Sequence, residues 1–204
     1  MGMPRTAFAH ALKPFYDFIE GVTSGQAERG VAPAVTGMTV SHEGVGQQRR
    51  TKFTFSSCAI AMVDAAGVVA YAGTKIFDFP AGKILFLGAC ANLALTKSSA
   101  GINDTFDGDF SLGTVTASNN ATLSSTEQDL IPTTATPQAV SGATTAKGAS
   151  TSTESCKVFD GTGTAIDAYL NFLIDDADHD VTGTPADLIV TGTLTIDWIN
   201  LGDY

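Results

Sequence analysis

The sequence contains little cysteine and little positive charge. Its three cysteines, Cys58, Cys90 and Cys156, are odd in number and show no C-x-x-C spacing, which argues against a disulfide framework and against a zinc site. Eleven basic residues stand against 21 acidic ones, so the chain carries a formal net charge of −10 and repels phosphate backbones and anionic lipid. No segment approaches the roughly 18 consecutive apolar residues of a membrane-spanning helix. We therefore expect buried free thiols and binding to neither nucleic acid nor membranes.

The sequence also lacks the motifs of common catalytic sites. It contains no G-x-S-x-G elbow, no G-x-x-x-x-G-K-[ST] phosphate loop and no H-E-x-x-H pair. Its three histidines, His10, His42 and His179, lie far apart in turn-like or terminal segments, where solvated side chains are expected. These absences predict a protein that is not an enzyme.

What the sequence does contain is the pattern of a folded β-protein, with 44% apolar and 16% charged residues. From about Thr36 onward, apolar and polar residues alternate at the period of a half-buried strand, most clearly over 188–198 and 166–175. Residues 84–95 are apolar at both odd and even positions, so both faces of this strand are apolar. This pattern predicts a strand covered on both faces or in contact with another subunit. Near Ser56 and Ser57 the apolar residues change from odd to even positions, and this shift in the alternation predicts a β-bulge.

About eight such strands, separated by glycine-rich turns and without intervening helices, predict an all-β fold, an antiparallel β-sandwich or jelly roll. We expect residues 36–204 to form this domain and residues 1–35 to form an N-terminal arm or short helix. Residues 118–155 are rich in Ser, Thr and Ala and are predicted to form a long, flexible loop.

Two segments are candidates for binding a partner. Phe15, Tyr16, Phe18 and Ile19 follow a roughly helical spacing, and they either pack on the domain's own core or reach a neighbouring subunit. Arg49 and Arg50, with Lys52, form the only basic cluster and open a strand, where they either are solvated or contact an acidic patch on a partner.

Carboxylates gather in two predicted turns. Asp175, Asp176, Asp178 and Asp180 alternate at the end of a strand and could bind Ca²⁺, a cation that prefers oxygen ligands. A second turn contains Asp104, Asp107 and Asp109. The simpler interpretation is that both are solvated turns, in which Asp bonds the local backbone. Calcium is the only cofactor that these residues suggest.

The Thr/Ala/Gly-rich strands, the low-complexity stretch at 132–155, the aromatic N-terminal segment and the closing run 191–198 together resemble capsid decoration or cement proteins of tailed bacteriophages. The resemblance implies a homo-oligomer, often a trimer, that is made in the host cytoplasm and joins the virion surface. There it would bind the major capsid protein where subunits meet and stabilise the mature head. The alternative is a head-fibre or tail-associated module that binds receptors or carbohydrates through the loops near 103–109 and 175–180.

Overall fold

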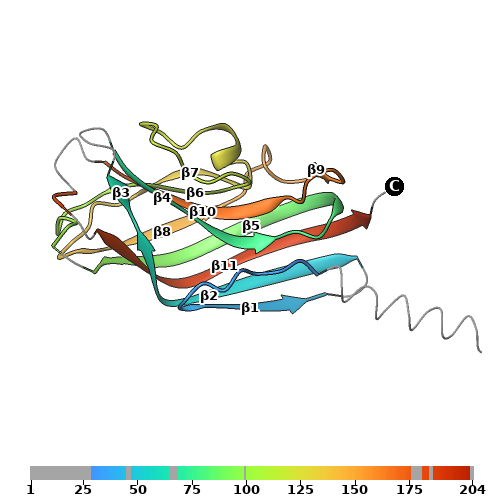
Figure 1. The fold of residues 1–204 in the computed structure, drawn as a ribbon, viewed down its shortest axis with the longest axis horizontal. Coiled ribbons are helices and arrows are strands. Elements are labelled where there is room, and N and C mark those ends of the chain that lie inside the picture. The colour runs from blue at the N-terminus through green and yellow to red at the C-terminus, as the bar shows by residue number, and fades with distance from the viewer. Residues whose placement is uncertain are drawn as a thin grey trace, which may run out of the picture.

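A computed structural model describes residues 29–44, 47–64, 69–98, 100–175, 181–183 and 186–202, and in these ranges the chain is almost entirely β-structure. Two antiparallel sheets pack face to face, which confirms the predicted all-β sandwich (Figure 1). The large sheet has the order β1-β2-β11-β5-β8, with β9 beside β5, and the small sheet has the order β3-β4-β10-β6-β7. The predicted N-terminal arm lies largely outside the described residues.

The large sheet contains three long strands in its centre. Its strands are β1 (Met38–Glu43), β2 (Gln48–Ala61), β11 (Asp187–Gly202), β5 (Gly82–Lys97), β8 (Ala143–Ala149) and β9 (Lys157–Gly161). The small sheet consists of β3 (Val63–Asp64), β4 (Val69–Asp78), β10 (Asp167–Asp175), β6 (Gly108–Gly113) and β7 (Ile131–Thr136), and one short 3-10 turn, η1 (Ser125–Glu127), precedes β7.

Alternating side chains build the core between the sheets. Along β2, Phe53, Phe55, Cys58 and Ile60 point inward and are buried. The parity changes between Phe55 and Cys58 because Ser56 and Ser57 occupy the space opposite Thr191 of β11, where the register shifts. The β-bulge predicted from the sequence is thereby confirmed, and it lets both halves of a 14-residue strand bury their apolar face.

An aromatic cluster fills one end of this core. The Trp198 ring lies 5.4 Å from the Phe79 ring and 6.0 Å from the Phe77 ring, and the tilted His42 ring lies 5.8 Å from the Phe77 ring. The indole Nε1 of Trp198 donates to the Thr51 hydroxyl over 3.1 Å, and both side chains are fully buried. His42 also contacts this hydroxyl, at 3.2 Å, so the expected solvated position is wrong for this histidine.

The expected loop over 118–155 is wrong in its second half, which forms β7 and β8. Small residues are needed there because the two sheets approach each other closely at this margin. Ala146 of β8 is fully buried, and a Cβ at Gly148 would lie 2.8 Å from the Phe110 ring. The side chain of Ser150 ties the margin together by donating to the Leu130 carbonyl over 2.5 Å.

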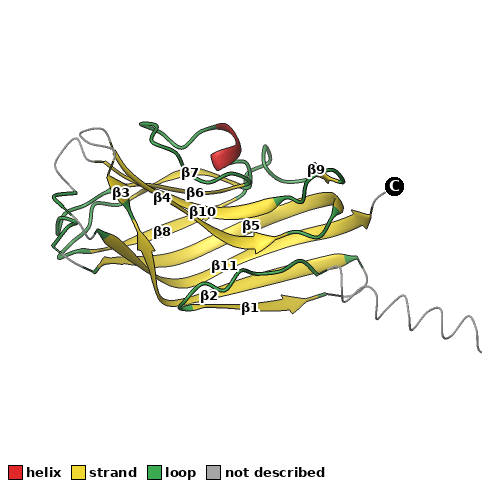
Figure 2. Ribbon diagram, viewed as in Figure 1, coloured by secondary structure: helices red, strands yellow, loops and turns green. Residues whose placement is uncertain are grey.

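The outer face of the small sheet is covered by residues 114–130 (Figure 2). Asn171 of β10 is fully buried beneath this segment and holds it in place. Its Nδ2 donates to the carbonyls of Val115 and Glu127, over 3.0 and 2.8 Å, and its Oδ1 accepts from the Ala117 N–H over 2.9 Å. The polar face predicted for this strand is therefore covered at Asn171, while Asp167, Tyr169 and Asp175 remain partly or fully exposed.

The buried carboxylate of Glu127 links two other parts of the covering segment by hydrogen bonds. The two oxygens of Glu127 accept from the backbone N–H groups of Ser118 and Ser124, over 3.0 and 2.9 Å. Two glycines, in β4 and β6 of the small sheet, leave room for this segment. A Cβ at Gly73 would collide with the Thr116 hydroxyl, and one at Gly113 would collide with the backbone of Glu127.

We predict that Thr51→Val destabilises the protein, because it leaves the buried Trp198 N–H without its acceptor. The expected loss in the free energy of unfolding is about 1–3 kcal/mol, measured by chemical denaturation. Thr54→Val makes the same exchange at an exposed position of the same strand and should change stability by less than about 0.5 kcal/mol. Equal effects of the two variants would contradict this role of Thr51.

Candidate binding face

The outer face of the large sheet is uncovered in the part of the chain that the structure describes. Because side chains alternate along β2, β11 and β5 on either side of their bulges, every second residue points away from the core. We call the central part of this surface the open face. It comprises Thr39, Ser41, Lys52, Thr54, Ser56, Ala59, Ile189, Thr191, Thr193, Thr195, Cys90, Asn92, Ala94, Thr96, Thr145 and Lys147.

Short polar side chains form aligned rows across the open face. Thr193 of β11 pairs with Thr54 of β2 on one side and with Asn92 of β5 on the other. The same row continues to Thr39 of β1 and to Lys147 of β8. Side chains opposite each other in such rows stand about 5 Å apart. The result is a broad surface of hydroxyl, methyl and amide groups with no long apolar side chain at its centre.

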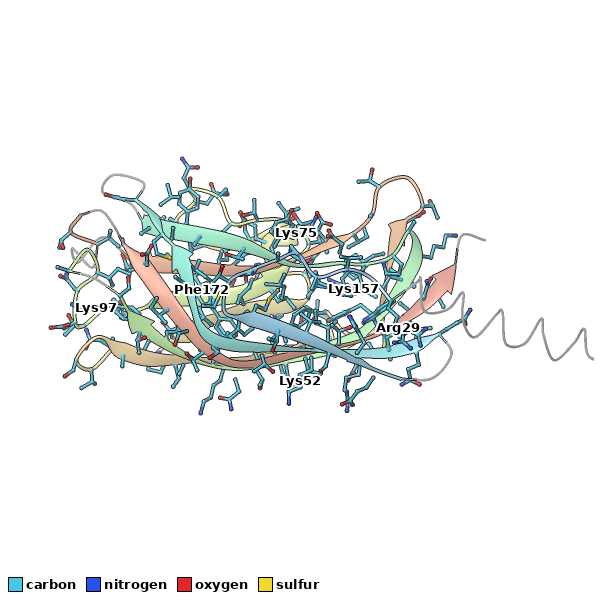
Figure 3. The ribbon with its side chains drawn as sticks, turned by 60° about the horizontal axis from the view of Figure 1, so that its bottom comes forward. Arg29, Lys52, Lys75, Lys97, Lys157 and Phe172 are labelled. Atoms are coloured by element: carbon cyan, nitrogen blue, oxygen red, sulfur yellow. The ribbon has the colours of Figure 1, made fainter. Side chains whose placement is uncertain are left out.

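The open face carries no carboxylate, although the chain as a whole is strongly acidic. Asp197 and Asp187 bound it at its two ends, and the charged residues between them are Lys52 and Lys147. Lys52 projects from the outer side of the large sheet, whereas Phe172 lies between the sheets (Figure 3). The centre of the face is therefore weakly basic and suits a neutral or acidic partner surface.

A hollow of about 640 Å³ lies at the Asp197 end of the open face. Arg50 and Asp197 line it and form a two-pronged ion pair, with N–O distances of 2.7 and 2.9 Å. This hydrogen-bonded carboxylate raises the pKa of the Arg50 guanidinium further above its usual value. The Arg50 charge is thus already paired within the subunit. Glu43 and Cys90 also line the hollow. All three cysteines are free, but the expected burial holds only for Cys58 and is wrong for Cys90 and Cys156, which are exposed.

The structure separates the two arginines that the sequence suggested as one basic contact. Arg50 points outward from β2, but Arg49 points to the opposite side and is 7% exposed. Neighbouring residues of a strand face opposite ways, so Arg49 and Arg50 cannot lie on one exposed surface. The other candidate contacts, Phe15, Tyr16, Phe18 and Ile19, lie outside the described residues.

Carboxylates from both predicted acidic segments meet on the opposite side of the molecule. Asp107, Asp109 and Asp175 line a hollow of about 470 Å³ beside the covered face of the small sheet. Burial, with the nearby carboxylates of Asp107 and Asp175, raises the pKa of Asp109. Asp176, Asp178 and Asp180 of the predicted calcium set lie outside the described residues. Within the described ranges, no group of three His, Cys, Asp or Glu residues is placed to hold a metal ion.

Comparison of the chain with protein-family models, curated proteins and solved structures found no match. No helix in the described ranges has the length and apolar character needed to cross a membrane. The sequence reasoning touched this face at residues 84–95, which were predicted to be covered on both faces or to contact another subunit. They lie in β5, and their outer side chains at Cys90, Asn92 and Ala94 are exposed, so coverage on both faces within the subunit is wrong. The rest of the open face gave little signal because Thr, Ser and Ala are common in exposed strands, although Thr191, Thr193 and Thr195 place three threonines on the same side of β11.

We predict that Asp109→Asn stabilises the protein at pH 7. Because the pKa of Asp109 is raised, the native state binds this proton more tightly than the unfolded chain, so the ionised group lowers stability at neutral pH. The variant should raise the melting temperature at pH 7 by about 2 °C, which corresponds to roughly 0.5–1 kcal/mol in a domain of this size. The gain should shrink as the pH falls toward the usual range of an aspartate.

Asp160→Asn provides the control. Asp160 is exposed, and hydrogen bonds from Thr162 lower its pKa, so its neutralisation should not stabilise the protein at pH 7. Thermal melts of both variants between pH 4 and pH 7 test the difference. A melting temperature for Asp109→Asn at or below that of the wild type at pH 7 would show that the ionised, partly buried Asp109 does not destabilise the native state.

Proposed function

We propose that this protein is a non-enzymatic structural subunit of a virion, of the capsid decoration type, which binds the major capsid lattice through the open face and stabilises the mature head. The observation that carries the proposal is that the outer faces of the two sheets differ in how far the chain covers them. The outer face of the small sheet is partly covered by residues 114–130, whereas that of the large sheet is bare in the described residues. The resemblance in sequence style points to the same class of protein.

The open face is large enough for a specific protein interface. Between Asp187 and Asp197 the open face follows β11 over a length of roughly 35 Å, and five neighbouring strands give a width of roughly 20 Å. The face is thus on the order of 700 Å², close to the roughly 800 Å² that each partner buries in a standard interface.

The side chains of the open face can be buried in an interface with little loss of conformational entropy. Thr, Ser and Ala lose little rotamer freedom when they are buried, and threonine offers both a methyl and a hydroxyl group. Contacts of modest affinity become effective when many subunits bind one shell, because each shell presents the same site repeatedly. A subunit that prefers the mature lattice shifts the equilibrium toward it.

We predict saturable binding of the purified protein to mature head shells of the phage whose genome encodes it, with a raised shell melting temperature. Thr193→Glu places a carboxylate at the centre of the open face and should weaken binding at least about tenfold, equivalent to about 1.4 kcal/mol. Thr122→Glu makes the same exchange at an exposed position of the covering segment of the small sheet and should bind like the wild type. Cosedimentation with shells measures both.

Two results would overturn the proposal. One is a folded wild-type protein that binds neither mature nor immature shells. The other is equal weakening by Thr193→Glu and Thr122→Glu, which would place the contact elsewhere or make it a non-specific effect of charge. Unchanged melting temperatures of the free variants ensure that folding is not the cause.

One observation favours the alternative of a head-fibre or tail-associated binding module. The loops near 103–109 and 175–180, which the sequence suggested as its binding surface, supply Asp107, Asp109 and Asp175 to a single hollow. Glycan binding that requires Ca²⁺ and is lost with both chelator and Asp109→Asn would support this function over shell binding.

A further inference from the structure

Beyond the Asp197 end of the open face, the outer side of the large sheet becomes apolar. Ile199 of β11 stands opposite Leu85 of β5, and Leu85 stands opposite Val158 of β9. The residues next to Ile199 and Leu85 along their strands are buried in the core, so this row points outward. Leu87 occupies the bulge of β5 beside the row. We call Leu85, Leu87, Val158 and Ile199 the apolar patch.

The described part of the chain leaves the apolar patch uncovered. Val158 is 57% exposed, and the other three side chains are partly exposed. Leu85 and Leu87 are the large outward side chains of residues 84–95, the stretch that is apolar at both odd and even positions. Contiguous apolar side chains on a surface are typical of a contact site, whereas isolated ones are not. The patch therefore calls for an occupant that lies outside the described ranges.

The described chain begins at the same end of the sandwich. Burial and the nearby charge of Arg29 lower the pKa of His42, so Arg29 lies beside β1. The next residue, Gly30, lies so close to the Phe77 ring that a side chain would collide with it. Phe77 contacts Trp198, the residue that directly precedes the apolar patch in β11. Residues 1–28 thus join the described chain close to this patch.

The residues before Arg29 are numerous enough to reach the apolar patch. β1 and β9 are four strand spacings apart in the large sheet, which corresponds to roughly 19 Å. Residues 20–28 can extend over roughly 30 Å. Figure 3 shows Arg29 and Lys157, the residue before Val158, toward one end of the molecule and Lys97 toward the other. The path from Arg29 to the patch is therefore short.

The sequence of residues 8–19 suits an apolar surface. Four large side chains, Phe8, Leu12, Phe15 and Ile19, recur at the spacing of one helix face. Such a stripe gains free energy when it is buried against another apolar surface. The groove beside β1 offers less room, because residues 32–36 of the chain itself already turn back along it.

We propose that residues 8–19, the docking segment, cover the apolar patch of their own subunit. The tether of residues 20–28 holds the docking segment at a high effective concentration beside its own patch, which favours this arrangement over exchange with a neighbouring subunit. The inference goes beyond the proposed function and does not depend on it, because the apolar patch lies outside the open face.

Cleavage of the full chain by chymotrypsin after Tyr16 and Phe18 tests the docking. Leu85→Glu places a charge in the apolar patch and should raise the cleavage rate at least about tenfold, since the rate follows the population of the undocked segment. Asn92→Glu introduces the same charge at an exposed outer position of the same strand and should leave the rate unchanged. Equal rates in the wild type and Leu85→Glu would overturn the proposal.

Cross-linking tests the same contact without altering Leu85, and it separates docking within one subunit from exchange between subunits. In a chain with Cys90→Ser and Cys156→Ser, a short bismaleimide should join Ile19→Cys to Val158→Cys within one monomer. Ile19→Cys with Val140→Cys is the control, because Val140 is 77% exposed and lies near the opposite end. Cross-linked dimers, or equal cross-linking of both pairs, would contradict docking on the same subunit. Cosedimentation of these variants with shells shows separately whether the proposed function fails.

Discussion

The structure depends on the burial of one side of three long strands. β2, β5 and β11 each bury an apolar side chain at almost every second position, and the opposing small sheet supplies the other half of the core. Each fully buried Leu, Ile or Phe side chain contributes roughly 1.5–3 kcal/mol relative to an exposed one. Because buried and exposed side chains alternate along these strands, the residues between the core positions point outward. These outward residues form the open face.

Polar groups determine which outer face remains open. The amide of Asn171 and the carboxylate of Glu127 hold the covering segment on the small sheet through hydrogen bonds to its backbone. Buried hydrogen bonds of this kind are costly to leave unmade, so the segment is fixed on this side. The acidic hollow lies on this covered side, away from the open face, whose charged residues are Lys52 and Lys147. The molecule thus has two chemically different sides.

Much of the fold could be predicted from the sequence, because alternation is a local signal. The strand through Leu194 and Trp198 and the bulge at Ser56 and Ser57 could be recognised from residue order alone. β7 and β8 could not, because their Thr, Ala and Gly residues are selected by the close approach of two sheets rather than by burial of large side chains.

The candidate sites were less predictable than the strands. Arg49 and Arg50 are neighbours in the chain, but strand geometry places them on opposite sides of the sheet. The meeting of Asp109 with Asp175 depends on β6 and β10 being neighbours, which no local pattern reveals. The open face is a property of many ordinary residues in register, so it becomes visible only when the pairing of the strands is known.

The two glycines beneath the covering segment have a consequence for how this protein can evolve. Gly73 and Gly113 leave no space for a side chain, and Asn171 satisfies three backbone groups, so this side of the molecule tolerates little change. Open-face positions such as Thr54 and Asn92 support none of the core. Natural variation can therefore accumulate on one side of the protein and follow changes in a binding partner, while the other side preserves the fold.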